Sequence, residues 1–154
     1  MIASTVARVP VNTADDVNER IRLMTEQSVA SCAARGPAAI EQRLAELDEE
    51  WDVERTLEAN ASIVSLVGLA LGATVDRRWF CLPAAVSGFL LQHAVQGWCP
   101  PLTILRRLGV RTASEIDYER YALKAIRGDF KSVPSGAPTS FQTARHALNI
   151  ARRN

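Results

Sequence analysis

Two side chains in the second half of the chain have the chemistry to react or to bind: the thiol of Cys99 and the imidazole of His93. Cys99 is followed by two prolines and then, about two helical turns later, by Arg106 and Arg107. A nearby cation lowers the pKa of a thiol and raises its thiolate fraction, the form that sulfur transfer and redox sensing require. The sequence leaves two interpretations of Cys99: a reactive thiol, or a small side chain that packs where a helix ends.

His93 belongs to a polar cluster with Gln92 and Gln96, inside an otherwise apolar stretch. Unpaired polar groups are costly in hydrocarbon, so such a cluster indicates either a ligand site or a hydrogen-bonded node. A metal or haem ligand is one interpretation of His93, but no second histidine or carboxylate stands at ligand spacing. The pattern therefore favours a node that locks two helices or two protomers, and it predicts no metal ion.

No other arrangement of residues indicates catalysis. The chain has no Ser-His-Asp set, no phosphate-binding glycine loop and no HExxH motif. Its three cysteines are widely spaced and form no CxxC pair, which argues against a zinc site or a disulfide framework. We therefore predict a protein that is not an enzyme and that needs no cofactor.

Charged residues are distributed unevenly along the 154-residue chain. Residues 1–59 carry six basic and twelve acidic side chains, whereas residues 106–154 carry ten basic and four acidic ones. Between them, residues 60–105 contain only Asp76, Arg77 and Arg78 as charged groups. A nearly uncharged middle between two oppositely charged ends predicts either a buried core hairpin or a membrane insert.

The uncharged middle has the pattern of two helices rather than of strands. Residues 61–75 and 79–105 lack charge and show no alternation with a period of two. The second stretch is long enough to span a bilayer, whereas fifteen helical residues cover only about 22 Å of its roughly 30 Å core. Bilayer thinning and snorkelling of Arg77 and Arg78 can cover part of that difference. We predict an all-α fold, in which a two-helix transmembrane hairpin is flanked by amphipathic cytoplasmic helices.

Small residues recur along both predicted spans. Gly68 and Gly72 form a GxxxG motif in an apolar stretch, where small faces let helix backbones approach closely in lipid. In water, glycine inside a helix costs roughly 0.5–1 kcal/mol relative to alanine, so the motif suits a soluble core less well. The predicted helix-packing residues are Ala61, Ser65, Gly68 and Gly72 in the first span, with Ala84 and Gly88 in the second.

The distribution of basic and aromatic residues predicts an orientation for the hairpin. More Lys and Arg residues flank its two ends than its central turn, so the positive-inside rule predicts that both termini lie in the cytoplasm. Trp79 and Trp98 stand near the ends of the second span, where interfacial indoles are common. We therefore expect a bacterial-type inner membrane location.

Amphipathic helices are predicted on both sides of the hairpin. Two segments match a capping box, one beginning at Thr13 and one at Thr112, and each precedes apolar residues at helical spacing. The chain is then divided into an acidic helical arm over 1–59, the hairpin over 60–110, an amphipathic helix over 111–130 and a basic flexible tail over 131–154.

The segment Gly97-Trp98-Cys99-Pro100 carries a resemblance to a known family. With the surrounding residues 52–110 it resembles the YgaP-like transmembrane domain family, whose second helix ends in a Gly-aromatic-Cys-Pro motif. The resemblance implies a short two-helix inner-membrane domain of unassigned role. Some members are fused to a rhodanese domain, but this chain has no rhodanese-like active-site loop, so the resemblance implies no sulfurtransferase activity.

Three hypotheses about function follow. The first is a membrane scaffold without enzymatic activity, which forms a homo-oligomer through its small residues. Its helical arms would lie at the membrane surface, where they could bind a cytoplasmic protein partner. The second is a sulfur or redox relay through Cys99. The third is a soluble helical bundle that buries residues 61–95 as its core. The basic residues form no dense cluster with aromatics, so we predict no nucleic-acid partner.

Overall fold

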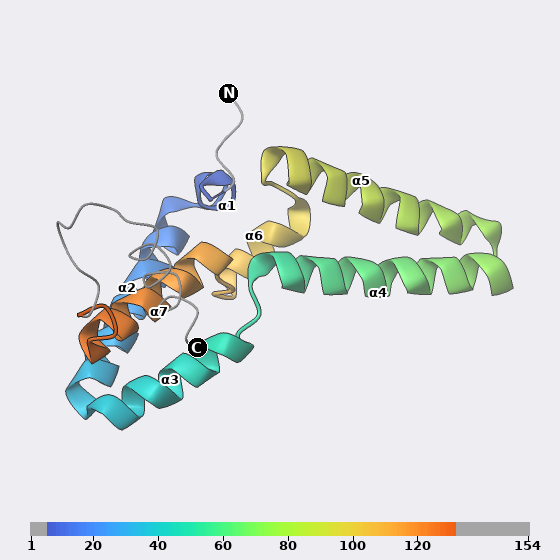
Figure 1. Ribbon diagram of the computed structural model, residues 1–154. Helices are drawn as coiled ribbons and strands as arrows, with labels where there is room; N and C mark the ends of the chain where they lie inside the picture. Colours follow the sequence, from blue (N-terminus) through green and yellow to red (C-terminus); the bar gives the residue numbers. More distant parts are fainter. Residues whose placement is uncertain (1–5, 132–154) are drawn as a thin grey trace, which may run out of the picture.

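The computed structural model describes residues 6–131, and within them the protein is built from helices alone, without a strand. The all-helical prediction is therefore confirmed for this part of the chain, whereas most of the predicted basic tail lies outside the described residues. The elements in chain order, shown in Figure 1, are α1 (Arg8–Val11), α2 (Asp15–Arg35), α3 (Pro37–Glu49), α4 (Val53–Thr74), the 3-10 helix η1 (Arg77–Phe80), α5 (Cys81–Gln96), α6 (Pro100–Arg107) and α7 (Ala113–Arg127).

Helices α2, α3 and α7 pack together into a helical body. The spacing of Ile40, Leu44 and Leu47 places all three on one face of α3, and all three are buried in a core shared with Leu123 of α7. The predicted arm over 1–59 and the predicted helix over 111–130 are thus parts of one unit rather than separate arms.

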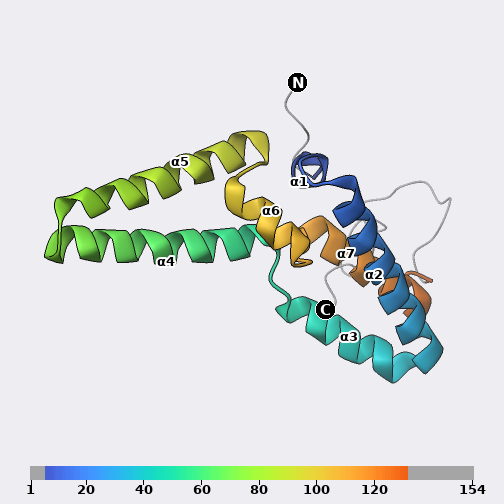
Figure 2. The same cartoon turned by 180° about the vertical axis from the view of Figure 1, so that it is seen from behind.

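Helices α4 and α5 lie side by side as an antiparallel hairpin that projects away from this body (Figures 1 and 2). The hairpin is joined at its tip by η1, and its other end meets α1 and α6. A second cluster of buried side chains holds this end: Val9, Val53, Leu57, Cys99 and Leu102. The first two turns of α4 therefore belong to the packed region, and only its later part is free of the body.

One of the two predicted capping boxes is confirmed and the other is wrong. The Thr112 side chain accepts a hydrogen bond from the backbone N–H of Glu115, whose carboxylate accepts from the backbone N–H of Thr112. At the predicted first box, however, α2 begins after Ala14 without a side-chain cap. Thr13 instead donates to the carbonyl of Val9, since the short helix α1 precedes it closely and offers its unpaired carbonyl groups.

Among residues 6–131, one helical stretch is long and apolar enough to cross a membrane, whereas the predicted second span is not a further candidate because α5 ends at Gln96 after 16 residues. The candidate stretch is Pro37–Thr74, which covers α3 and α4, and only 17% of its apolar window is buried. Such a test is also met by core helices of soluble proteins, but those are mostly buried. The apolar part of this stretch therefore lies mostly on the surface of the protein.

Candidate functional site

The hairpin exposes large apolar side chains along both of its helices. On α4, Ile63 is 60% exposed and Leu66 is 65% exposed, and on α5 Leu91 is 67% exposed. The helical body, in contrast, has a core in which Leu47 and Leu123 are almost completely buried. Soluble monomers rarely expose contiguous apolar surface on this scale, and such a surface indicates contact with a membrane or a protein partner.

The glycines of the GxxxG motif pack inside the hairpin. A Cβ atom built on Gly68 would lie 2.7 Å from Cδ of Pro83, and one on Gly72 would lie 2.7 Å from the Phe80 ring. Both glycines are buried, so the stripe through them is covered by the start of α5 and by η1 of the same chain. This packing removes the two glycines from the homo-oligomer contact predicted for them. On α5, in contrast, Ala84 and Gly88 are exposed, and nothing lies within 4 Å of a Cβ added at Gly88.

Because Gly72 lies against the Phe80 ring, we expect Gly72→Leu to open the tip of the hairpin, since the new side chain needs the space of that ring. Overpacking of this kind costs roughly 1–3 kcal/mol, which raises the population of the opened tip by a factor between about 5 and about 150. Trypsin cleavage after Arg77 and Arg78, measured in detergent, should accelerate accordingly. The matched control is Gly88→Leu, which should leave the rate unchanged, and equal rates in the two variants would contradict the packing at Gly72.

A polar cluster joins the base of the hairpin to the N-terminal segment. Nε2 of His93 lies 2.9 Å from Oε2 of Glu54, and Nη2 of Arg8 donates to Oε1 of the same carboxylate at 2.8 Å. Arg8 also donates through Nη1 to the carbonyl of Ala94 at 3.0 Å. Three elements, α1, α4 and α5, are therefore connected through one carboxylate.

Of the predicted intramembrane cluster, only His93 is buried, with 4% of its surface exposed, whereas Gln92 is half-buried and Gln96 is exposed. The carbonyl of Gln96 accepts a hydrogen bond from Asn12 at 3.0 Å. The hydrogen-bonding partner of His93 is thus a glutamate on the other hairpin helix, near the helical body, rather than its glutamine neighbours.

Cys99 is 2% exposed and belongs to the buried cluster at the base of the hairpin. Burial raises the pKa of its thiol, and the nearby Glu54 carboxylate acts in the same direction. The cation expected to activate it lies elsewhere, since the guanidinium of Arg106 donates to the Glu115 carboxylate at 2.6 and 2.8 Å. Cys99 therefore favours the neutral thiol form, which is the less nucleophilic one.

An apolar cavity of about 200 Å³ lies between α4 and α5 near their base. Its lining includes Val64 of α4, Leu90 of α5, Cys99, and Pro101 of α6. An apolar cavity offers water no hydrogen-bonding partners, so this space suits hydrocarbon rather than solvent.

A network of buried ions holds the three helices of the body together. The Glu119 side chain of α7 is completely buried, and it accepts hydrogen bonds from Arg43 of α3 at 2.8 Å, from Ser28 of α2 at 2.6 Å and from Arg111 at 2.5 Å. Burial alone would raise the pKa of this carboxylate, but the hydrogen bonds from these three side chains outweigh burial and lower the pKa to about 2.

This network was not predicted from the sequence, in which the basic residues after the hairpin were considered only as charges that flank its end. The one signal in the sequence is the position of Glu119, three residues after Ile116 and four before Leu123, on the apolar face of α7. A charged residue at such a position indicates a buried partner.

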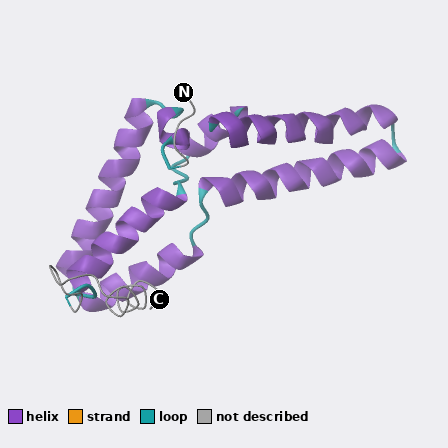
Figure 3. Ribbon diagram, turned by 45° about the horizontal axis from the view of Figure 1, so that its top comes forward, coloured by secondary structure: helices purple, strands orange, loops and turns teal. Residues whose placement is uncertain are grey.

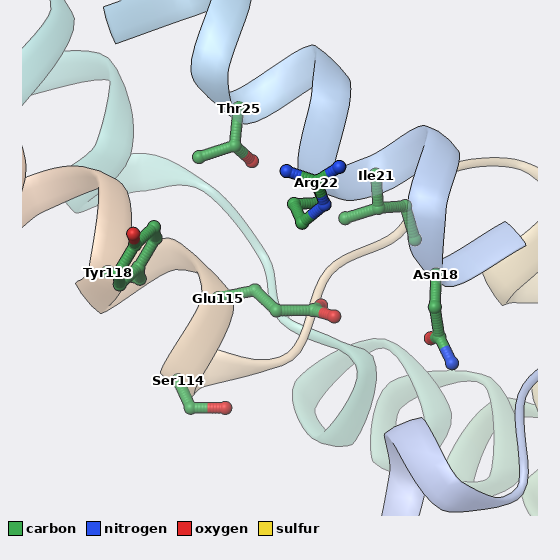
Figure 4. A pocket seen from close by; sticks show the side chains of 7 residues that line it. All are labelled: Asn18, Ile21, Arg22, Thr25, Ser114, Glu115 and Tyr118. Carbon is green, nitrogen blue, oxygen red and sulfur yellow. The ribbon is translucent and has the colours of Figure 1, made fainter. Parts of the chain in front are cut away.

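A second hollow of about 240 Å³ lies between α2 and α7. Figure 4 shows Asn18 and Thr25 of α2 facing Glu115 and Tyr118 of α7 across it. Two of its polar groups are engaged already, since Arg106 donates both to Oδ1 of Asn18 and to the Glu115 carboxylate. The hollow therefore presents no nucleophile beside a free general base.

Within residues 6–131, no group of three or more His, Cys, Asp or Glu side chains gathers at a spacing that could hold a metal ion. No protein-family model matches the chain, and no similar protein was found among curated proteins or solved structures. The YgaP-like resemblance stays a prediction. The apolar hairpin and its polar base are therefore the features of this chain that indicate a function.

Proposed function

We propose that this protein is a small integral membrane protein without enzymatic activity, in which the α4–α5 hairpin enters the bilayer and the helical body stays at the cytoplasmic surface. The observation that carries the proposal is the exposed apolar surface of a hairpin that projects from a well-packed body. This exposure also argues against the soluble bundle, because residues 61–95 are not its buried core.

The dimensions of the hairpin are compatible with a thin bilayer. The uncharged part of α4, from Ala59 to Thr74, extends over about 24 Å at 1.5 Å per residue, and α5 with Trp79 and Phe80 extends over about 27 Å. Both values are below a typical hydrocarbon thickness of about 30 Å, a mismatch that local thinning accommodates. The charged groups of Asp76, Arg77 and Arg78 are exposed at the tip, where they can reach the opposite headgroups.

The orientation follows from the position of the body. The helical body contains a buried network of arginines and glutamates, which is costly to transfer into hydrocarbon, so the body stays in water. Because the basic residues are more numerous beside the body than at the tip, the positive-inside rule puts the body and both termini in the cytoplasm of a bacterial-type cell.

We propose the role of a scaffold that holds the body at the membrane, in line with the YgaP-like resemblance. Oligomerisation through the GxxxG stripe is not part of the proposal, because α5 and η1 cover these glycines. The relay through Cys99 is not favoured either, since this thiol is buried and its pKa is raised.

The test is alkaline carbonate extraction of bacterial membranes that contain the full chain. We expect the protein to stay in the pellet and to dissolve in mild detergent. In spheroplasts, external trypsin should cleave only at the tip, after Arg77 and Arg78. Release by carbonate as a folded soluble species would overturn the proposal.

A further inference from the structure

The end of the hairpin that meets the body has a surface of its own, which differs from both the apolar hairpin and the ion-paired body. It is formed by exposed side chains of α2, of α6 with the residue that follows it, and of the first turn of α4 with the segment before it: Arg20, Trp51, Arg55, Ile104, Arg107 and Leu108. We call these six residues the basal collar. It combines three cations with three large apolar side chains.

Helix α6 contributes most of the apolar surface of the collar. It buries Leu102 and Arg106 on one side, whereas Ile104 is 62% exposed on the other and Leu108, just beyond the helix end, is 75% exposed. At 100° per residue, Pro101 shares the exposed side with Ile104 and Leu108, and Pro101 also lines the apolar cavity of the hairpin. The exposed side of α6 is thus continuous with the apolar surface of the hairpin.

The three arginines of the collar lack carboxylate partners. Arg43, Arg106 and Arg111, in contrast, each pair with a glutamate. Among residues 6–131, no carboxylate pairs with Arg20, Arg55 or Arg107. These cations therefore remain available for an external anion.

Two short contacts gather the collar cations at defined positions. Nη2 of Arg20 donates to the carbonyl of Arg107 at 2.8 Å, which holds two exposed arginines of α2 and α6 close together. The guanidinium of Arg55 lies 4.3 Å from the centre of the Trp51 ring, at the start of α4. Trp and Arg side by side at the end of an apolar helix are typical of a membrane–water interface.

We propose that the basal collar binds the phosphate headgroups of anionic phospholipids, so that α6 lies in the headgroup region of the cytoplasmic leaflet. This inference rests on the proposed function, because it requires the hairpin to be in the bilayer. Anionic lipid is the occupant that satisfies both parts of the collar, since its phosphate neutralises the arginines and its acyl chains cover Ile104 and Leu108.

The test uses the fluorescence of single tryptophans in the full chain, which has three. The variant W79F/W98F retains only Trp51 of the collar, and the variant W51F/W98F retains only Trp79 near the tip. Each is reconstituted in phosphatidylcholine vesicles that contain brominated phosphatidylcholine or brominated phosphatidylglycerol as the quencher. Relative association of the two lipids with each tryptophan is obtained from quenching at increasing mole fractions.

We expect phosphatidylglycerol to be preferred near Trp51 by at least five-fold at low ionic strength, since one arginine near an anionic surface alters association by about that factor. The preference should disappear in R20Q/R55Q/R107Q and should weaken in high salt. It should persist in R22Q/R35Q/K131Q, which removes the same charge elsewhere on the body.

The outcomes separate this inference from the proposed function. If Trp79 is quenched but Trp51 is quenched equally by both lipids, or by neither, the hairpin is in the membrane and the collar inference is wrong. If Trp79 is not quenched by either lipid, the membrane proposal itself fails, and the collar inference fails with it.

Discussion

Arginine in place of both Leu66 and Leu91 is expected to release the protein from bacterial membranes. Leu66 lies near the middle of the uncharged part of α4, and both leucines point outward, with 65% and 67% of their surface exposed. An arginine at the centre of a spanning helix opposes insertion by about 3 kcal/mol, and one nearer the end of the span by somewhat less. The double variant should thus lose about 5 kcal/mol of insertion free energy, measured as the protein fraction that resists carbonate.

The same double variant distinguishes a membrane hairpin from an exposed hairpin in water. Exposed positions of soluble proteins tolerate such changes within about 0.5 kcal/mol, and added charge improves solubility. The matched control is Leu23→Arg, which alters a side chain of the body that is 42% exposed and should leave the protein in the membrane pellet. A double variant that stays in the pellet as firmly as the natural sequence would contradict insertion of the hairpin.

The elements of the fold could be predicted from the sequence where local signals are strong. Ile40, Leu44 and Leu47 have the spacing of a helix face, and all three are buried. Trp51 follows Leu47 at the same helical spacing, but α3 ends at Glu49, so Trp51 lies outside the helix and is 49% exposed. The capping box at Thr112 was predictable because both of its hydrogen bonds join Thr112 to Glu115, three residues later in the chain.

The partners in the site could not be predicted, because they are far apart in the chain. Glu54 and His93 are separated by 39 residues, and Arg43 and Glu119 by 76. A single sequence indicates which face of a helix is apolar, but not which helix covers that face. For this reason the GxxxG motif was assigned to a second protomer, whereas the structure fills the space beside Gly68 and Gly72 with Pro83 and Phe80.

The buried network of the body leads to the last prediction, that Glu119→Gln destabilises the protein by about 3–5 kcal/mol. The substitution preserves the size of the side chain but removes the one fully buried carboxylate of the network, so that Arg43 and Arg111 keep only their pairs with the more exposed Glu46 and Glu50. Breaking a buried ion pair has a cost of this size. The measurement is urea-induced unfolding in detergent, followed by circular dichroism. The control is Glu46→Gln, which breaks an ion pair to Arg43 whose carboxylate is 49% exposed, and it should cost less than about 1 kcal/mol.

The pH dependence of the stability difference between the natural sequence and Glu119→Gln shows whether the charge of Glu119 causes that difference. The pKa of Glu119 falls from an ordinary value of 4.5 to about 2 in the folded protein, so the folded state binds this proton less readily than the unfolded state. The stability that the carboxylate contributes is then fully present above pH 4.5 and is lost as the pH falls toward 2. Other carboxylates titrate in both proteins, but the difference between the natural sequence and Glu119→Gln should shrink over this interval. A difference that stays constant with pH would show that packing, rather than the charge of Glu119, stabilises the body.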